Sequence, residues 1–475
     1  MKEKKLHVHF MGIGGSAVSG VAILAKKAGF KVSGCELQEQ TAYSPTLSKF
    51  GIKPFLGHDV SHLKGVDLVA VSPALLFNHP LSTELLEAEK KRILITWQEF
   101  LGRFLQKDKK VIAIAGTHGK STVTALVGFL AEGAGIDPTV EVGALIPQWG
   151  ATVRFGRSDY FICEADEFNY NFLHYSPGVI ILNNLEMDHP EFFKNFDHFL
   201  EAFVKFIQKI KEPKILIVNE EDQGIQKLLG KMKGWLLKEK VKVIGFFLEK
   251  QFSFPFFHEY QGILPEKQEA DDLTKFKVKN DSFEQDFMME LSGVHNVYNA
   301  LGAIACGFEL GFPEGKMKKA LSGFKGLERR FELVGEEKGI KVYDDYAVHP
   351  TAVEATLLAA RGKYPKAKIW AVFESHQYSR LKLFLNEFAQ SLDLADQVII
   401  TPIYQGREKN NQTIKESDLV DKIGEKAQFL SDFDLIVKNL VSRVKKDEII
   451  IVFGAGYSYQ LARMILSGLK NERKN

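Results

Sequence analysis

Short apolar segments alternate with amphipathic segments along almost the whole chain. The apolar runs have the length of buried strands, and in the segments that follow them apolar residues recur every three or four positions, as in helices. The pattern predicts helices at 17–28, 121–131 and 296–310. It predicts strands at 6–11, 31–35, 67–72, 111–115, 160–163, 179–182, 215–218, 341–344, 368–373, 397–401 and 448–453. Strands that alternate with helices indicate parallel sheets covered on both faces.

Breaks in this pattern divide the chain into three α/β domains in series. A charged stretch at 106–110 is interpreted as a linker, and a new unit begins near residue 327. The expected domains are therefore 1–107, 108–326 and 327–475. Residues 245–285 lack clear periodicity, so antiparallel strands or loops are expected there.

Composition and charge exclude several classes of protein. The 475 residues carry 62 basic and 60 acidic side chains, for a net charge of +2, whereas nucleic-acid-binding proteins are usually more basic. No apolar run approaches the roughly 20 residues of a membrane helix. The charged segment at 1–6 has no signal-peptide pattern. We expect a cytoplasmic protein that neither inserts into membranes nor binds nucleic acid.

The three cysteines, Cys35, Cys163 and Cys306, lie far apart and form no CxxC pair. This spacing supports neither a disulfide framework nor a zinc site. Each is interpreted as a small buried hydrophobic residue in a reducing compartment.

The strongest chemical pattern is a glycine-rich turn between an apolar strand and a helix. Glycines let backbone N–H groups face an anion, and the helix N-terminus adds partial positive charge. Lys120 is expected to neutralise nucleotide phosphates, and Ser121 or Thr122 to reach Mg²⁺. Ile114 stands where the full Walker pattern has its first glycine, so a plain corner with a surface lysine is the alternative. The turn consists of Gly116, Thr117, His118, Gly119, Lys120, Ser121 and Thr122.

A second glycine-rich turn, with Gly12, Gly14, Gly15 and Ser16, follows the first predicted strand. It resembles a dinucleotide-binding fingerprint, and Glu36 lies at about the right distance to contact a ribose. The pattern indicates an anionic nucleotide or sugar nucleotide and does not choose between NAD and UDP. A tight turn without a ligand is the alternative. A dehydrogenase would bind NAD tightly, and a second nucleotide site disfavours that class.

Acidic residues and a histidine follow two predicted strands of the central domain. Strand C-termini line the ligand crevice of a parallel sheet, so these residues share an edge with the phosphate-binding turn. Oxygen ligands suit Mg²⁺, and an imidazole can complete a second metal site. Helix capping by the aspartates, or a loop role for the histidine, is the alternative. The residues are Glu164, Asp166, Glu167, Glu186, Asp188 and His189.

Further polar residues occur in the last third of the chain. Asn296 and Asn299 share a helix face, where they either meet a ligand or cap the helix. Arg330, at a domain junction, is expected to clamp a phosphate on closure or to remain solvated. Two loops at what we expect to be adjacent strand ends form a predicted second substrate pocket. They contribute Asp345, His349, His376 and Arg380.

In this order, the motifs resemble the Mur ligase family over nearly the whole chain. The family's ATP loop corresponds to residues 115–122, and its magnesium-binding pair corresponds to 164–167 with 188–189. Its adenine contact corresponds to 294–300, its hinge to 329–331 and its C-terminal nucleotide contacts to 344–346. Segment 376–380 and Ile403-Tyr404 resemble the members that add L-alanine.

The resemblance implies an ATP- and Mg²⁺-dependent ligase that joins L-alanine, or Gly or Ser, to UDP-N-acetylmuramic acid through an acyl phosphate, in peptidoglycan precursor synthesis. It implies a Rossmann-like UDP-sugar domain, a central P-loop ATPase-type domain and a Rossmann-like C-terminal domain for the amino acid and nucleotide. A monomer or weak dimer is expected. The implied catalytic residues are Lys120, Glu164, His189 and Arg330. The implied nucleotide contacts are residues 116–122 with Asn296, Asn299, Arg330 and Asp345. The implied substrate contacts are Gly12, Gly14, Gly15, Ser16, His349, His376 and Arg380, and the implied Mg²⁺ ligands are Ser121, Glu164 and His189.

Two departures from the family pattern concern the acceptor. Val348 and Gln377 stand where the family usually has His and Arg, and segment 182–189 is closer to the relative that recycles murein tripeptide. L-Alanine is the favoured acceptor and the tripeptide is the alternative. An ATP-gated sugar-nucleotide-binding protein without ligation is the alternative of another class. A folylpolyglutamate-type ligase would lack the first glycine-rich domain.

Overall fold

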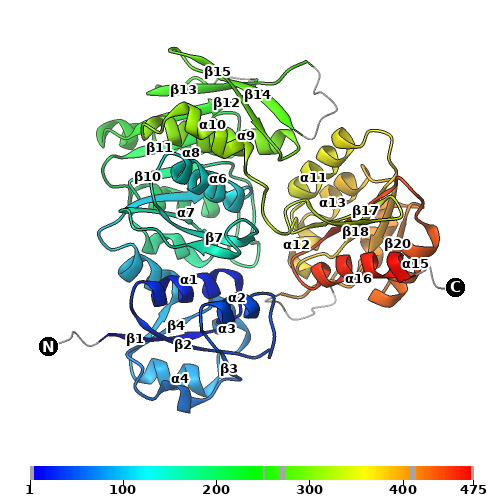
Figure 1. Ribbon diagram of the computed structural model, residues 1–475, viewed down its shortest axis with the longest axis horizontal. Coiled ribbons are helices and arrows are strands. Elements are labelled where there is room, and N and C mark those ends of the chain that lie inside the picture. Colours follow the sequence, from blue (N-terminus) through cyan, green and yellow to red (C-terminus); the bar gives the residue numbers. More distant parts are fainter. Residues whose placement is uncertain (1–4, 250–251, 267–272, 407, 409–412, 472–475) are drawn as a thin grey trace.

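The computed structural model describes residues 5–249, 252–266, 273–406, 408 and 413–471 and consists of three α/β domains (Figure 1). The first and central domains lie end to end, and the third lies beside them. The predicted fold class is confirmed, and every predicted strand and helix is present within one or two residues of its expected ends.

The first domain is built on a parallel sheet with the strand order β3-β2-β1-β4-β5. Its strands are β1 His7–Met11, β2 Lys31–Glu36, β3 Phe55–Leu56, β4 Leu68–Val71 and β5 Leu94–Thr96. Its helices are α1 Ser16–Lys27, α2 Ser44–Lys49, η1 Val60–Leu63, α3 Pro73–Asn78, α4 Thr83–Lys90, α5 Trp97–Phe100 and η2 Leu101–Leu105. All five residues of β1 are buried, as expected for a strand covered on both faces.

The central domain contains ten described strands in the order β15-β14-β13-β12-β11-β10-β6-β9-β7-β8. They are β6 Lys110–Ala115, β7 Thr139–Ile146, β8 Ala151–Arg154, β9 Tyr160–Glu164, β10 Val179–Leu182, β11 Ile215–Asn219, β12 Lys242–Phe247, β13 His258–Ile263, β14 Thr274–Lys279 and β15 Glu284–Met289. Its helices are α6 Lys120–Gly133, η3 Phe168–His174, α7 Phe196–Ile207, α8 Gln223–Lys238, α9 Val294–Glu309 and α10 Glu314–Ser322. The antiparallel pairs β13–β14 and β14–β15 confirm the expectation for residues 245–285.

The third domain has a sheet with the strand order β16-β17-β21-β18-β19-β20. Its strands are β16 Glu332–Glu337, β17 Ile340–Asp345, β18 Ile369–Phe373, β19 Gln397–Ile400, β20 Ala427–Phe429 and β21 Ile449–Phe453. Its helices are α11 Pro350–Lys363, α12 Tyr378–Leu383, α13 Leu385–Leu392, α14 Glu416–Ile423, α15 Phe433–Arg443 and α16 Ser458–Asn471. The expectation that the β17 and β18 loops leave adjacent strands is wrong, because β21 pairs with both strands and lies between them.

The first and central domains share one apolar core, with α1 packed against β7 and β8. Gly20 allows this close approach, since a Cβ there would lie 2.6 Å from Thr152 Oγ1 and 2.6 Å from Val153 Cγ1. Across the described ranges, no helix is long and apolar enough to cross a membrane.

All three cysteines are buried, as predicted. The interpretation of Cys35 as a small apolar side chain is wrong, however. Its Sγ lies 3.1 Å from His58 Nδ1, 3.3 Å from His9 Nε2 and 3.2 Å from Glu84 Oε2. The sequence could not reveal this cluster because its members come from four separate elements or loops.

Candidate active site between the domains

The predicted phosphate-binding turn connects β6 to α6 and depends on two glycines with positive φ. Gly116 has φ +131° and Gly119 has φ +80°. A Cβ on Gly119 would lie 2.3 Å from Asn299 Oδ1 and 2.6 Å from Asn183 Nδ2, so only glycine fits there. The buried strand thus delivers the turn to the N-terminus of α6, where backbone N–H groups can face an anion.

Lys120 points back over this turn. Its Nζ donates to the Gly116 carbonyl at 2.6 Å and contacts Glu167 Oε2 at 3.1 Å. Burial alone would lower the pKa of Lys120, but the carboxylates of Glu167 and Asp166 outweigh burial and raise it. The ammonium group is therefore charged and held beside the turn.

Three ligand-capable side chains gather next to Lys120. Asp166, Glu167 and His189 each offer one ligand atom, and these three atoms lie within 4.8 Å of one another. The predicted partner of His189, Glu164, is absent from this group. Glu164 is the last residue of β9, and its Oε1 accepts the Gly143 N–H at 2.6 Å. The sequence placed three carboxylates in this segment, but the turn after β9 decides which of them face the histidine.

A second group joins the central and third domains. His118 Nε2 lies 2.6 Å from Glu186 Oε1, and the rings of His118 and His349 are 4.7 Å apart. His349 Nε2 also contacts the Met187 carbonyl at 3.3 Å, and Thr351 Oγ1 donates to Glu186 at 2.9 Å. Burial, with a contribution from His118, lowers the pKa of His349 to about 4, so its imidazole is neutral at pH 7.

An ion pair between Arg380 and Asp188 links the same two domains. Arg380 NH2 and Nε lie 2.6 and 3.2 Å from Asp188 Oδ1, and the arginine is only 1% exposed. Burial would raise the pKa of Asp188, but Arg380 outweighs it and holds that pKa well below its usual range. His376 Nδ1 lies 2.8 Å from Arg380 NH1, so this histidine supports the arginine that reaches the central domain.

Gln377, one of the two departures from the expected pattern, lies next to His376 and is buried with φ +77°. Within the described ranges, neither its Oε1 nor its Nε2 has a hydrogen-bond partner. A buried amide without partners is costly, and its position beside His376 puts unused donor and acceptor capacity near the domain interface.

The asparagines of α9 and the domain-junction arginine approach the phosphate-binding turn. Asn299 Nδ2 donates to Asn296 Oδ1 at 3.0 Å, and Asn183 Nδ2 donates to Asn299 Oδ1 at 3.1 Å. Arg330 NH2 lies 3.4 Å from Ser121 Oγ. Asp345 instead accepts the Phe331 and Ala347 N–H groups at 2.8 and 2.7 Å and the Thr356 hydroxyl at 3.1 Å, which anchors the junction loop.

The first glycine-rich turn is closed by Glu36. Gly12 has φ +74° and its N–H donates to the Cys35 carbonyl at 3.0 Å, while the Gly14 N–H donates to Glu36 Oε2 at 2.9 Å. A Cβ on Gly14 would lie 2.7 Å from that same oxygen, so this approach of Glu36 needs glycine.

Comparison with known proteins accounts for all three domains. Family profiles match residues 7–109 ("Mur ligase family, catalytic domain"), 114–307 ("Mur ligase middle domain") and 329–456 ("Mur ligase, glutamate ligase domain"). The chain belongs to the Mur ligase family. It is 36% identical to the UDP-N-acetylmuramate–L-alanine ligase of Alkaliphilus metalliredigens, with 98% of each chain covered. It is 37% identical to the ligase of the same name from Caldicellulosiruptor bescii, with 94% and 95% covered.

Two solved structures extend this comparison. The UDP-N-acetylmuramate–alanine ligase of Thermotoga maritima superimposes on this Mur ligase with a TM-score of 0.80 at 25% identity, covering 98% of this chain and 100% of that one. A murein peptide ligase from Psychrobacter arcticus gives a TM-score of 0.74 at 27% identity, covering 98% and 99%.

In this Mur ligase, the predicted residues gather in two places. The phosphate-binding turn, His189, Arg330, His349 and the α9 asparagines surround the junction of the central and third domains, together with Arg380 and His376. The first glycine-rich turn lies apart in the first domain. Sequence reasoning included Asp166 and Glu167 in the predicted metal-binding cluster but chose Glu164 as the carboxylate ligand. It also missed the pairing of Asp188 with Arg380, which needs two domains to be placed against each other.

Proposed function

We propose that this Mur ligase uses ATP to join L-alanine to the carboxylate of UDP-N-acetylmuramic acid. The observation that carries the proposal is the similarity to L-alanine ligases over 94–98% of the chain. The geometry supports it, because the phosphate-binding turn, an acidic metal-capable group and a loop of the third domain meet at one junction.

The donor set beside Lys120 fits a divalent cation. Asp166 and Glu167 offer carboxylate oxygens and His189 offers an imidazole, all within 4.8 Å of one another. We assign these three side chains, with Ser121, as the candidate Mg²⁺ ligands, and Glu164 as an outer residue that orients the β7 backbone. Mg²⁺ held there would supply charge neutralisation for the transferring phosphoryl group.

The chemistry takes two displacement steps. A carboxylate oxygen of the sugar acid attacks the γ-phosphorus of ATP, the bond to the ADP oxygen breaks, and an acyl phosphate forms. The amine of L-alanine then attacks the acyl carbon, the bond to the phosphate oxygen breaks, and the amine loses a proton as the amide forms. Lys120 positions the phosphates and offsets their charge, and Arg330 reaches the same turn from the third domain.

Closure of the third domain protects the acyl phosphate from water. Arg380 with Asp188, Thr351 with Glu186 and His349 with Met187 form contacts across the junction. Excluding water from a reactive intermediate is a general function of such closure. The UDP moiety is assigned to the first glycine-rich turn, and the acceptor amino acid to the His349 and His376 side of the junction.

The test measures ADP formation with ATP, Mg²⁺ and UDP-N-acetylmuramic acid while the acceptor is varied among L-Ala, Gly, L-Ser and the L-Ala-γ-D-Glu-diaminopimelate tripeptide. The product mass identifies the amide. We expect turnover with L-alanine, and we expect Lys120→Met to abolish it. Lys233→Met is the control, because Lys233 is exposed on α8. Turnover with the tripeptide alone would assign the chain to murein recycling instead. Nucleotide binding without turnover for any acceptor would favour a binding protein.

A further inference from the structure

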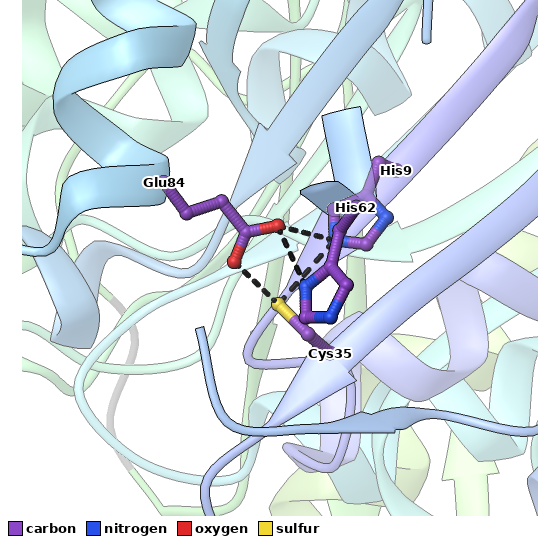
Figure 2. A group of neighbouring side chains, drawn as sticks. All are labelled: His9, Cys35, His62 and Glu84. Carbon is purple, nitrogen blue, oxygen red and sulfur yellow. Dashed lines mark hydrogen bonds and ion pairs between the residues drawn. The ribbon is translucent and has the colours of Figure 1, made fainter. Parts of the chain in front are cut away.

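A cluster of metal-ligating side chains lies in the first domain, outside the proposed active site. His9 comes from β1, Cys35 from β2, His62 from η1 and Glu84 from the first turn of α4. Figure 2 shows the four side chains pointing toward one another, with the Glu84 carboxylate at the centre of the contacts. From this geometry we propose that His9, Cys35, His62 and Glu84 form a structural Zn²⁺ site.

The distances between the ligand atoms suit a small tetrahedral cation. Zn–N, Zn–O and Zn–S bonds of about 2.0 to 2.3 Å give tetrahedral edges of roughly 3.3 to 3.6 Å. His9 Nε2 lies 3.0 Å from Glu84 Oε1 and 3.3 Å from Cys35 Sγ. Glu84 Oε1 lies 3.2 Å from His62 Nδ1, and Glu84 Oε2 lies 3.2 Å from Cys35 Sγ. No two of the four ligand atoms are more than 4.8 Å apart, so shifts of about 1 Å complete the tetrahedron.

The surroundings hold His9 in the orientation that a metal ligand needs. Its Nδ1 contacts Ser33 Oγ at 2.9 Å, which directs Nε2 to the cluster, and the same hydroxyl contacts His7 Nε2 at 2.8 Å. Metal-bound histidines almost always use their second ring nitrogen in this way. His9 and Glu84 are completely buried, where an isolated carboxylate would be costly without a cationic partner.

The donor types of the cluster match one class of cation. His58 lies beside the cluster, with its Nδ1 3.1 Å from Cys35 Sγ and 3.4 Å from Glu84 Oε2. Two imidazoles, one thiolate and one carboxylate form a borderline-soft donor set, which favours Zn²⁺ over Mg²⁺. His62, whose side chain is 11% exposed beneath the outer Phe55 ring, gives the ion a route from solvent.

The site would link four elements of the first domain and support its glycine-rich turn. The Cys35 carbonyl accepts the N–H groups of Gly12 and Ile13 at 3.0 and 3.2 Å. A metal on the Cys35 side chain therefore restrains the strand end to which this turn is attached. A bound Zn²⁺ would stabilise the first domain whether or not the proposed ligase reaction takes place.

The experiment titrates the full-length apo protein with Co²⁺, which replaces Zn²⁺ in such sites and gives a near-ultraviolet charge-transfer band when a thiolate is a ligand. In the described part of the chain, Cys35 is the only cysteine in a group of ligand-capable residues, so this band separates the site from Mg²⁺-type sites. We expect one equivalent to saturate the band, Zn²⁺ to displace it, and Zn²⁺ to raise the melting temperature.

Matched variants decide the assignment. Cys35→Ser should abolish the band, whereas Cys306→Ala in α9 should keep it. Ser33→Ala retains every ligand but removes the partner that orients His9, so it should weaken Zn²⁺ binding by roughly 10- to 100-fold. This variant tests the site even if Cys35→Ser folds poorly. A missing band in the wild-type protein, a band that survives in Cys35→Ser, or unchanged affinity in Ser33→Ala would overturn the proposal.

Discussion

Removing the positive charge of Arg380 should open the junction between the central and third domains. In Arg380→Met, Asp188 would remain buried in the closed form without its cationic partner. Breaking a buried pair in this way typically costs about 3 to 5 kcal/mol. The His189 N–H still donates to Asp188 Oδ1 at 2.7 Å, so the lower figure applies. Because opening hydrates the carboxylate, the cost falls on the closed form alone. A change of about 3 kcal/mol moves the ratio of closed to open molecules roughly 100-fold.

Single-molecule fluorescence energy transfer measures this ratio directly. Cysteines introduced at the exposed positions Lys233 in α8 and Lys438 in α15 carry the dyes, and the native cysteines are buried and protected from labelling. We expect a broader distribution at longer distances in Arg380→Met. Adding Asp188→Asn should restore part of the closed population, since it removes the uncompensated charge.

Arg361→Met is the matched control. Arg361 pairs with Asp396 at 2.8 Å, but both residues belong to the third domain and are 35% and 41% exposed. Loss of this pair should leave the interdomain distance unchanged. If Arg380→Met kept the wild-type distribution, or if Arg361→Met widened it equally, the ion pair would not be what holds the domains together.

Three further predictions concern charge. Lys120→Met should lower kcat/KM for ATP by roughly 100- to 1000-fold, measured as ADP release with unchanged circular dichroism. Glu167→Gln should raise the Mg²⁺ concentration for half-maximal activity more than Glu164→Gln; equal effects would contradict our ligand assignment. Burial raises the pKa of Glu220 to about 8. Between about pH 4.5 and 8 the Glu220 carboxyl is therefore protonated in the folded state but ionised in the unfolded state. Over this range each unit of rising pH should lower the free energy of unfolding by about 1.4 kcal/mol. Glu220→Gln should remove that slope in denaturant titrations across this range.

Much of the fold follows from local patterns in the sequence. All four residues of the strand at 179–182 are buried. A short, continuous apolar run of this kind is typical of a central strand that is covered on both faces. The hairpin β7–β8 was missed because Thr139–Ile146 holds a glycine and a buried glutamate, which interrupt the apolar run. The position of β21 between β17 and β18 was missed since strand order depends on contacts between distant segments.

The candidate site was predictable where it depends on one segment and unpredictable where it depends on several. The phosphate-binding turn is contained in residues 116–122, so its glycines and lysine could be assigned directly. The choice of Glu167 over Glu164 depends on the chain direction after β9. The clusters around Asp188 and Cys35 join residues that are 192 and 49 positions apart, a relation that no local spacing carries.

The most direct test of the central claim follows oxygen from the sugar acid. UDP-N-acetylmuramic acid labelled with ¹⁸O in its carboxylate is turned over with ATP and L-alanine, and the released phosphate is analysed by mass. If the carboxylate attacks the γ-phosphorus, the phosphate carries one ¹⁸O atom and the new amide keeps the other. Unlabelled phosphate from a reaction that forms the amide would contradict activation through an acyl phosphate.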